Sequence, residues 1–309
     1  LQRAVRRMTN EIARVRGKPF PVAVRVATTL EGCHKIGYDI ESWVEEKLCD
    51  IIIAGGTAGT DPTVEVEDFK KLLYGTGISL YPGYDFHRQQ EARRLISTQD
   101  WRVAWFRSLS AGFWDRGVDG IYVFNWHANA EMRRLELTTI GDPLTLQGTD
   151  KVYSAIYRKN LPKDSSHAGT DPVDRIYGET PVTLYRTLTN DGPKFQVPVY
   201  DHVSQAANEG LLAKTELHIE LGHYSTQDEV QVTLDGLKLG EPMVCNVTAE
   251  DPNNPSEVDE NSWLIWQLDP HQADYGRHEI QVKLVKRDTR IHPPLIISQV
   301  DLHIMYVAD

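Results

Sequence analysis

Polar side chains gather around the first β-rich run of this sequence, Val22–Ala27. Arg25 lies within the run, and Glu31 and His34 follow it. A carboxyl group can donate or accept a proton, and guanidinium and imidazole groups can form hydrogen bonds with hydroxyls. These residue types favour a site for a polyhydroxylated ligand, with Glu31 as a candidate catalytic carboxyl.

Two later runs, Ile78–Tyr81 and Gly120–Asn125, end in the same way. The residues at their ends carry aromatic, carboxyl, amide and imidazole groups: Tyr81, Tyr84, Asp85, Asn125, Trp126 and His127. A sugar site needs flat aromatic faces, donors for hydroxyls and, for bond cleavage, two carboxyls. Asp85 is therefore the second catalytic candidate. The other side chains, with Arg25 and His34, are candidate substrate-binding residues.

The elements that position these residues alternate in type. Expected strands are Val22–Ala27, Asp50–Ala54, Ile78–Tyr81 and Gly120–Asn125. Expected helices are Leu1–Arg16, Ile40–Lys47, Val66–Leu73, Gln89–Ile96 and Trp101–Gly117. This alternation predicts parallel βαβ units, with the strands adjacent in chain order. Because a closed (β/α) barrel needs about eight strands, four strands predict half of one.

The later part of the chain has a pattern typical of strands without intervening helices. After a helix expected over Asp142–Tyr153, short runs alternate between two faces: Thr215–Leu221, Glu229–Leu234, Ser262–Leu268, His278–Val285 and Gln299–Tyr306. Asp235-Gly236 is a tight-turn signal within a hairpin. Short strands with turns between them predict a β-sandwich. The expected domains are therefore 1–160, the α/β half barrel, and 161–309, the sandwich.

Four segments carry a resemblance to a known family: GYDIESWVEEKLCDIIIAGG, ISLYPGYD, RSLSAGFWDRGVDGIYVFNWHA and TIGDPLTLQGTDKVYSA. They resemble the back half of the barrel in bacterial glycoside-hydrolase-like proteins, in which a jelly-roll-like sandwich follows. The resemblance implies the C-terminal half of a TIM-type (β/α)8 barrel, with the first four strands and any signal peptide upstream of Leu1. A periplasmic or extracellular location is compatible with it, and the sequence leaves the compartment open.

The resemblance implies an oligosaccharide or polysaccharide partner and hydrolysis of glycosidic bonds in the complete protein. In the largest barrel clan of retaining glycosidases, catalytic glutamates follow the fourth and seventh strands. Here the strand matching the seventh is followed by Tyr81–Asp85, without a glutamate. Two alternatives stay open: a non-catalytic carbohydrate-binding or structural relative, and a different barrel enzyme such as an isomerase or aldolase.

The candidates also have structural interpretations. Asp39 precedes a helical pattern and is expected to be its N-cap, and Asp85 could cap the next helix in the same manner. Glu31 could be merely solvated. Arg25, inside an apolar strand, must point into the barrel or pair with a carboxylate, because an unpaired buried charge is costly. Trp126 could pack between domains.

Composition narrows the partners. A net charge of -11 argues against nucleic acid, whose binders present a basic face, and no apolar run approaches the roughly 18 residues of a membrane span. Three cysteines imply no disulfide framework, with Cys33 and Cys49 expected to be buried and inert. The histidines lack metal-ligand spacing and the glycine-rich loop lacks a P-loop ending, so no metal or cofactor is expected. The open sheet edges predict pairing with a missing barrel half or self-association.

Overall fold

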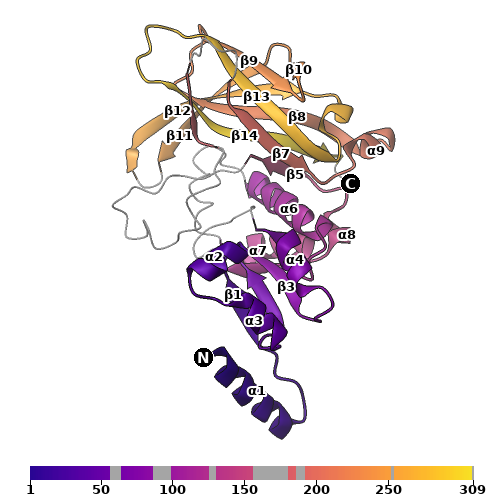
Figure 1. The fold of residues 1–309 in the computed structure, drawn as a ribbon. Coiled ribbons are helices and arrows are strands. Elements are labelled where there is room, and N and C mark those ends of the chain that lie inside the picture. Colours follow the sequence, from indigo (N-terminus) through magenta and orange to yellow (C-terminus); the bar gives the residue numbers. More distant parts are fainter. Residues whose placement is uncertain are drawn as a thin grey trace. The chain divides into compact units, whose positions relative to one another are not determined.

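We analysed a computed structural model of the chain, which describes residues 1–55, 64–85, 99–124, 130–155, 180–185, 192–251 and 254–307. The described chain divides into two compact units. Unit 1 comprises Leu1–Gln90, Phe113–Asn129 and Asn160–Ile176. Unit 2 comprises Glu91–Gly112, Ala130–Lys159 and Tyr177–Asp309. Figure 1 colours both by position in the sequence.

Unit 1 is built on a parallel sheet of four described strands in the order β1-β2-β3-β4. These strands are β1 (Ala23–Val26), β2 (Ile51–Ala54), β3 (Ser79–Asp85) and β4 (Tyr122–Phe124). Its helices are α1 (Gln2–Arg16), α2 (Leu30–Lys35), α3 (Ile40–Glu45) and α4 (Val66–Leu73). Each neighbouring pair of strands is parallel, which confirms the predicted strand order.

Local signals set the helix ends of unit 1. Gly17 ends α1 in the left-handed region, at φ 65°. Asp39 caps α3 as expected, because its side chain accepts a hydrogen bond from the backbone N–H of Ser42 at 3.2 Å. Within the described residues, β1 pairs only with β2 and β4 only with β3. Self-association through these edges therefore stays a prediction.

Unit 2 contains two antiparallel sheets, in the orders β10-β9-β13-β7 and β11-β12-β8-β14-β5, with β6 also pairing with β14. Its strands are β5 (Lys151–Ser154), β6 (Val182–Leu184), β7 (Lys194–Val199), β8 (Leu212–Gly222), β9 (Glu229–Leu234), β10 (Leu237–Lys238), β11 (Met243–Asp251), β12 (Asn254–Gln267), β13 (Gly276–Lys286) and β14 (Leu295–Tyr306). The β9–β10 hairpin turns at Asp235 and Gly236, both at positive φ, as the sequence predicts.

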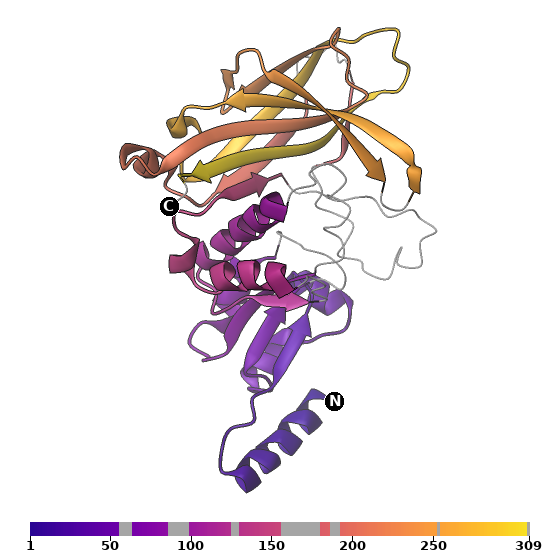
Figure 2. The same cartoon turned by 180° about the vertical axis from the view of Figure 1, so that it is seen from behind.

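The two sheets of unit 2 share one hydrophobic core. Alternate residues of β8 and β14 enter it, including Leu217, Ile219 and Leu302, all fully buried. They pack with residues from β7, β9 and β13 of the other sheet, such as Phe195 and Val282. Figure 2 shows these strands from behind as two layers. The predicted antiparallel strands of this region are therefore confirmed, whereas the jelly-roll-like sandwich stays a prediction.

The remaining helices are α6 (Gln99–Asp115), α7 (Ala130–Ile140), α8 (Pro143–Leu146), α9 (Val203–Asn208) and the short 3₁₀ helix η1 (Pro270–Ala273). The helix expected over Asp142–Tyr153 is wrong beyond Leu146, because Lys151–Ser154 forms β5 and pairs with β14. Ser154 lies opposite Asp301, so this strand depends on a partner far away in the sequence. The helix expected over Gln89–Ile96 lies outside the described residues.

Candidate active site

The parallel sheet of unit 1 brings two of the predicted binding residues into one row. Arg25 of β1 pairs with Ile53 of β2, which pairs with Tyr81 of β3. Because side chains alternate between the faces of a strand, Arg25 and Tyr81 lie on the same face of the sheet. Both are partly buried. We call the region where β1–β4 end, with the segments that follow them, the strand-end edge.

Two glycines lie where neighbouring groups of the parallel sheet approach closely. A Cβ atom on Gly55, directly after β2, would lie 3.0 Å from the carbonyl oxygen of Gly83 in β3. The ring of Tyr81 occupies the space next to Gly120, where a Cβ atom would lie 2.6 Å from the Cζ atom. A side chain at Gly55 would therefore crowd the backbone of β3, and one at Gly120 would displace the ring of Tyr81.

Glu65 joins the segment before α4 to the end of β1. Its backbone N–H donates to the carbonyl of Thr28 at 3.0 Å, and its carboxylate accepts from the N–H of Leu30. Burial raises the pKa of the Glu65 carboxyl, and the negative charges of Asp68 and Glu31 act in the same direction. A carboxyl in this environment keeps its proton to higher pH than an ordinary glutamate.

Thr28 places a buried hydroxyl at the same edge. The residue is 1 % exposed, and its Oγ1 atom has no hydrogen-bond partner among the residues that the structure describes. Its neighbour Thr29 differs, because the Thr29 hydroxyl caps α2 by accepting from the N–H of Gly32 at 2.8 Å. A buried hydroxyl without a partner is costly, and within the described residues the Thr28 hydroxyl stays available as a hydrogen-bonding group.

Glu31 and His34 lie on α2, a short helix that is not among those expected from the sequence. The Thr29 cap starts a short helix there, and Glu31 occupies its first turn. The exposed Glu31 carboxylate lies 2.6 Å from the Nζ atom of Lys35, one turn later. The hydrogen bond from Lys35, together with its charge, lowers the pKa of Glu31. His34 is also exposed, with its Nε2 atom 3.0 Å from Glu41.

The other predicted site residues are described only in part or not at all. Tyr84 and Asp85 end β3, where their backbones pair with Val123 and Phe124 of β4. The pleat of β3 puts position 85 on the same face as Tyr81. Asn125, Trp126 and His127 lie outside the described residues. Their proposed roles stay predictions.

Sequence reasoning missed the two residues whose surroundings are most unusual, Thr28 and Glu65. Both lie in segments that follow strand ends, and that position is the signal that could have found them. Burial of the Glu65 carboxyl depends on how its segment folds back onto β1, which sequence spacing does not specify.

We also searched the described residues for metal sites, reactive thiols and membrane-spanning helices. No group of three or more histidine, cysteine, aspartate or glutamate side chains there could hold a metal ion. Cys33 and Cys49 are buried as predicted, and burial raises the pKa of each thiol to about 11, which keeps both thiols protonated at neutral pH. None of the described helices is long and apolar enough to cross a membrane.

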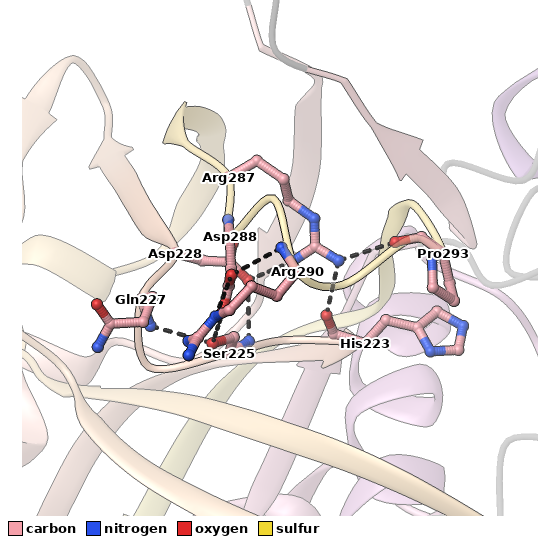
Figure 3. A network of polar contacts seen from close by, with 8 residues as sticks. All are labelled: His223, Ser225, Gln227, Asp228, Arg287, Asp288, Arg290 and Pro293. Atoms are coloured by element: carbon pink, nitrogen blue, oxygen red, sulfur yellow. Dashed lines mark hydrogen bonds and ion pairs between the residues drawn. The ribbon is translucent and has the colours of Figure 1, made fainter.

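Unit 2 contains a polar cluster in which, unlike at Glu65, the carboxylates accept several hydrogen bonds (Figure 3). It joins the segment His223–Asp228 to the segment Arg287–Pro293, and we call it the loop clamp. Asp228 accepts from the backbone N–H of Asp288 at 2.6 Å and from Arg287. Arg287 also donates to the carbonyls of His223 and Pro293, at 3.0 and 2.8 Å. These partners indicate a structural role in holding two loops together.

Comparison with known proteins leaves the family open. No family model matches the sequence, and no curated protein matches it. Two solved structures of a two-domain esterase active on acetylated mannans have a weak overall likeness. The one co-crystallised with mannopentaose has a TM-score of 0.24 and 10% identity, covering 98% of this chain and 96% of that chain. The other has a TM-score of 0.23 and 9% identity, with the same coverage. Likeness at this level does not establish a shared fold or activity.

Proposed function

We propose that this protein binds carbohydrate at the strand-end edge of unit 1 and hydrolyses glycosidic bonds there. In this proposal the parallel sheet is the C-terminal half of a TIM-type barrel, and unit 2 contributes a jelly-roll-like sandwich. Barrel enzymes place their chemistry where strands end, because the βα loops gather there. The family resemblance of the sequence supplies the substrate class.

One observation carries the catalytic part of the proposal. Two carboxyls near enough to influence each other, Glu65 and Glu31, have pKa values shifted in opposite directions. Glycoside hydrolysis needs one protonated carboxyl to protonate the leaving oxygen and one ionised carboxylate as base or nucleophile. Divergent environments of two carboxyls are a sign of such a pair. We assign Glu65 as the proton donor and Glu31 as the ionised partner.

The remaining residues have binding roles in the proposal. Thr28 offers its hydroxyl to a sugar hydroxyl, and Tyr81 offers part of an aromatic surface. Arg25, in the same row as Tyr81, donates to sugar oxygens. Asp85 is the alternative to Glu31, since position 85 shares the face of Tyr81 and Arg25.

Hydrolysis of aryl glycosides with different leaving groups tests the role of Glu65. General acid catalysis contributes about 10²–10⁴-fold, so Glu65→Gln should lose about that factor on a phenyl glycoside. The loss should be much smaller on a dinitrophenyl glycoside, whose leaving group needs no proton. Glu45→Gln, an exposed change on α3, is the matched control and should leave both rates unchanged. Equal rates for Glu65→Gln and wild type on both substrates would contradict the assignment.

A second candidate function is carbohydrate binding without catalysis. The observation in its favour is that Glu31 is exposed and already paired with Lys35. In that case, calorimetric titration with oligosaccharides should show binding by a chain that hydrolyses no glycoside. Glu65→Gln should then weaken oligosaccharide binding, and neither the wild type nor the variant should hydrolyse a glycoside.

A further inference from the structure

The second face of the six-stranded sheet in unit 2 carries ionisable side chains that are buried. Leu217, Ile219 and Leu302 point into the core, so the residues between them point to the opposite face. That face carries six polar residues of β8 and β14: Glu216, His218, Glu220, Gln299, Asp301 and His303. We call them the imidazole row. Five of the six are less than a tenth exposed, and the side chain of His218 is 14 % exposed.

The two imidazoles of the row lie face to face. The rings of His218 and His303 have centroids 3.8 Å apart and planes 11° from parallel. At that separation a proton on one ring strongly opposes a proton on the other. The Nε2 atom of His218 lies 2.9 Å from Glu216, which also pairs with Lys214 at the rim. These two partners lower the pKa of Glu216 to about 2, so its carboxylate stays ionised.

The deeper half of the row is incompletely satisfied. Asp301 accepts from Gln299 at 2.6 Å through Oδ2, but its Oδ1 atom has no hydrogen-bond partner among the described residues. The same is true of Nε2 of His303, which lies 3.9 Å from Oδ2 of Asp301. Both residues are at most 4 % exposed. Their separation leaves the pair just short of a hydrogen bond.

We propose that the imidazole row is an acid-sensitive latch: this sheet face stays buried while His303 is neutral and opens when His303 takes up a proton. A cation on His303 would lie buried beside a second imidazole. Of the charged groups that face it, Asp301 and Glu216 attract the cation, and a protonated His218 would repel it. The latch lies in unit 2 and does not depend on the carbohydrate proposal for unit 1.

The direction of the pH effect follows from the surroundings of His303. Burial lowers the pKa of His303 from the ordinary 6.5, and the neighbouring His218 acts in the same direction. The open or unfolded chain therefore binds a proton at His303 more tightly than the closed chain does. This difference begins to favour opening as pH falls below about 6.5. The stability that neutral His303 gives to the closed face is therefore fully present above about pH 6.5 and decreases as pH falls below it.

Hydrogen–deuterium exchange of the full chain tests the latch. Exchange of β14 amides, corrected for the intrinsic effect of pH, should speed up about tenfold between about pH 7.5 and pH 5. Exchange of β9, in the other sheet, should change less. His303→Gln cannot be protonated and should abolish the acid effect on β14. The matched control His223→Gln, an exposed histidine of the same unit, should retain it.

Two results would overturn the latch. One is an acid effect on β14 of equal size in wild type and His303→Gln. The other is opening of the same amides by a chelator at about pH 7.5, which would show that a cation rather than neutral imidazoles keeps the face closed. If His303→Gln does not fold, His218→Gln provides the second variant, because it removes the stacked ring and should also reduce the acid effect.

Discussion

Carboxylates of the loop clamp and of the strand-end edge have contrasting surroundings. In the loop clamp, Asp228 and Asp288 receive hydrogen bonds from arginines, a serine and backbone N–H groups. At the strand-end edge, the carboxyl of Glu65 has one backbone donor and like-charged neighbours. Thr28, beside it, has a hydroxyl with no partner in the described part of the chain.

The difference separates acids that hold the fold together from the acid to which we assign the proposed chemistry. Bonds to an ionised carboxylate favour the charged form, and the bonds from Arg290 and Ser225 lower the pKa of Asp288 well below its usual range. Burial raises the pKa of Glu65 even though its carboxylate accepts a bond from the N–H of Leu30. Polar groups left incompletely paired at a strand-end edge therefore indicate a ligand site more strongly than their residue types do.

The largest expected effect comes from breaking the loop clamp. The Asp228 side chain is 0 % exposed, and its loss leaves the Arg287 guanidinium without its carboxylate partner. Asp228→Asn should lower the free energy of unfolding by about 3–5 kcal/mol in urea denaturation. The control is Glu229→Gln, whose ion pair with Lys286 is more than half exposed and should contribute less than about 1 kcal/mol. Similar losses of unfolding free energy in both variants would show that the buried carboxylate of the loop clamp contributes no more to stability than an exposed ion pair.

Thr28→Val tests whether a side chain of the strand-end edge contributes to ligand binding and not to stability. Removing a buried hydroxyl that has no partner among the described residues should not lower the free energy of unfolding and should raise it by up to about 1 kcal/mol. Thr29→Val is the control and should cost about 0.5–2 kcal/mol, because it removes the cap of α2. Thr28→Val should nevertheless weaken oligosaccharide binding about tenfold in calorimetric titration. A clearly destabilised Thr28→Val with unchanged binding would show that the hydroxyl is structural.

The smallest expected effect is the pH dependence contributed by Glu65. Its folded pKa lies above the ordinary glutamate value of 4.5, so the folded chain binds this proton more tightly than the unfolded chain. The stability it contributes is complete below that value and is lost as pH rises through the folded pKa. Urea denaturation should therefore find Glu65→Gln as stable as wild type or more stable at neutral pH. A loss of stability there would place Glu65 among the structural acids.

The parts of this structure that sequence could predict are those set by local chemistry. The cap at Asp39, the hairpin at Asp235-Gly236 and the order of β1–β4 follow from capping, turn geometry and short crossovers. Strand β5 does not, because Lys151–Ser154 becomes a strand only by pairing with β14. The candidate site divides in the same way. Tyr81 and Arg25 could be placed from strand spacing, whereas the burial of Glu65 depends on tertiary contact.

Titration of the glutamate carboxyl carbons by ¹³C NMR, without and with saturating oligosaccharide, tests the central claim most directly. Glu65→Gln identifies the Glu65 signal. The account predicts that this signal titrates above the ordinary glutamate value and that its pKa shifts when sugar binds. A Glu65 signal with an ordinary pKa that sugar does not change, in a chain that still binds sugar, would contradict it.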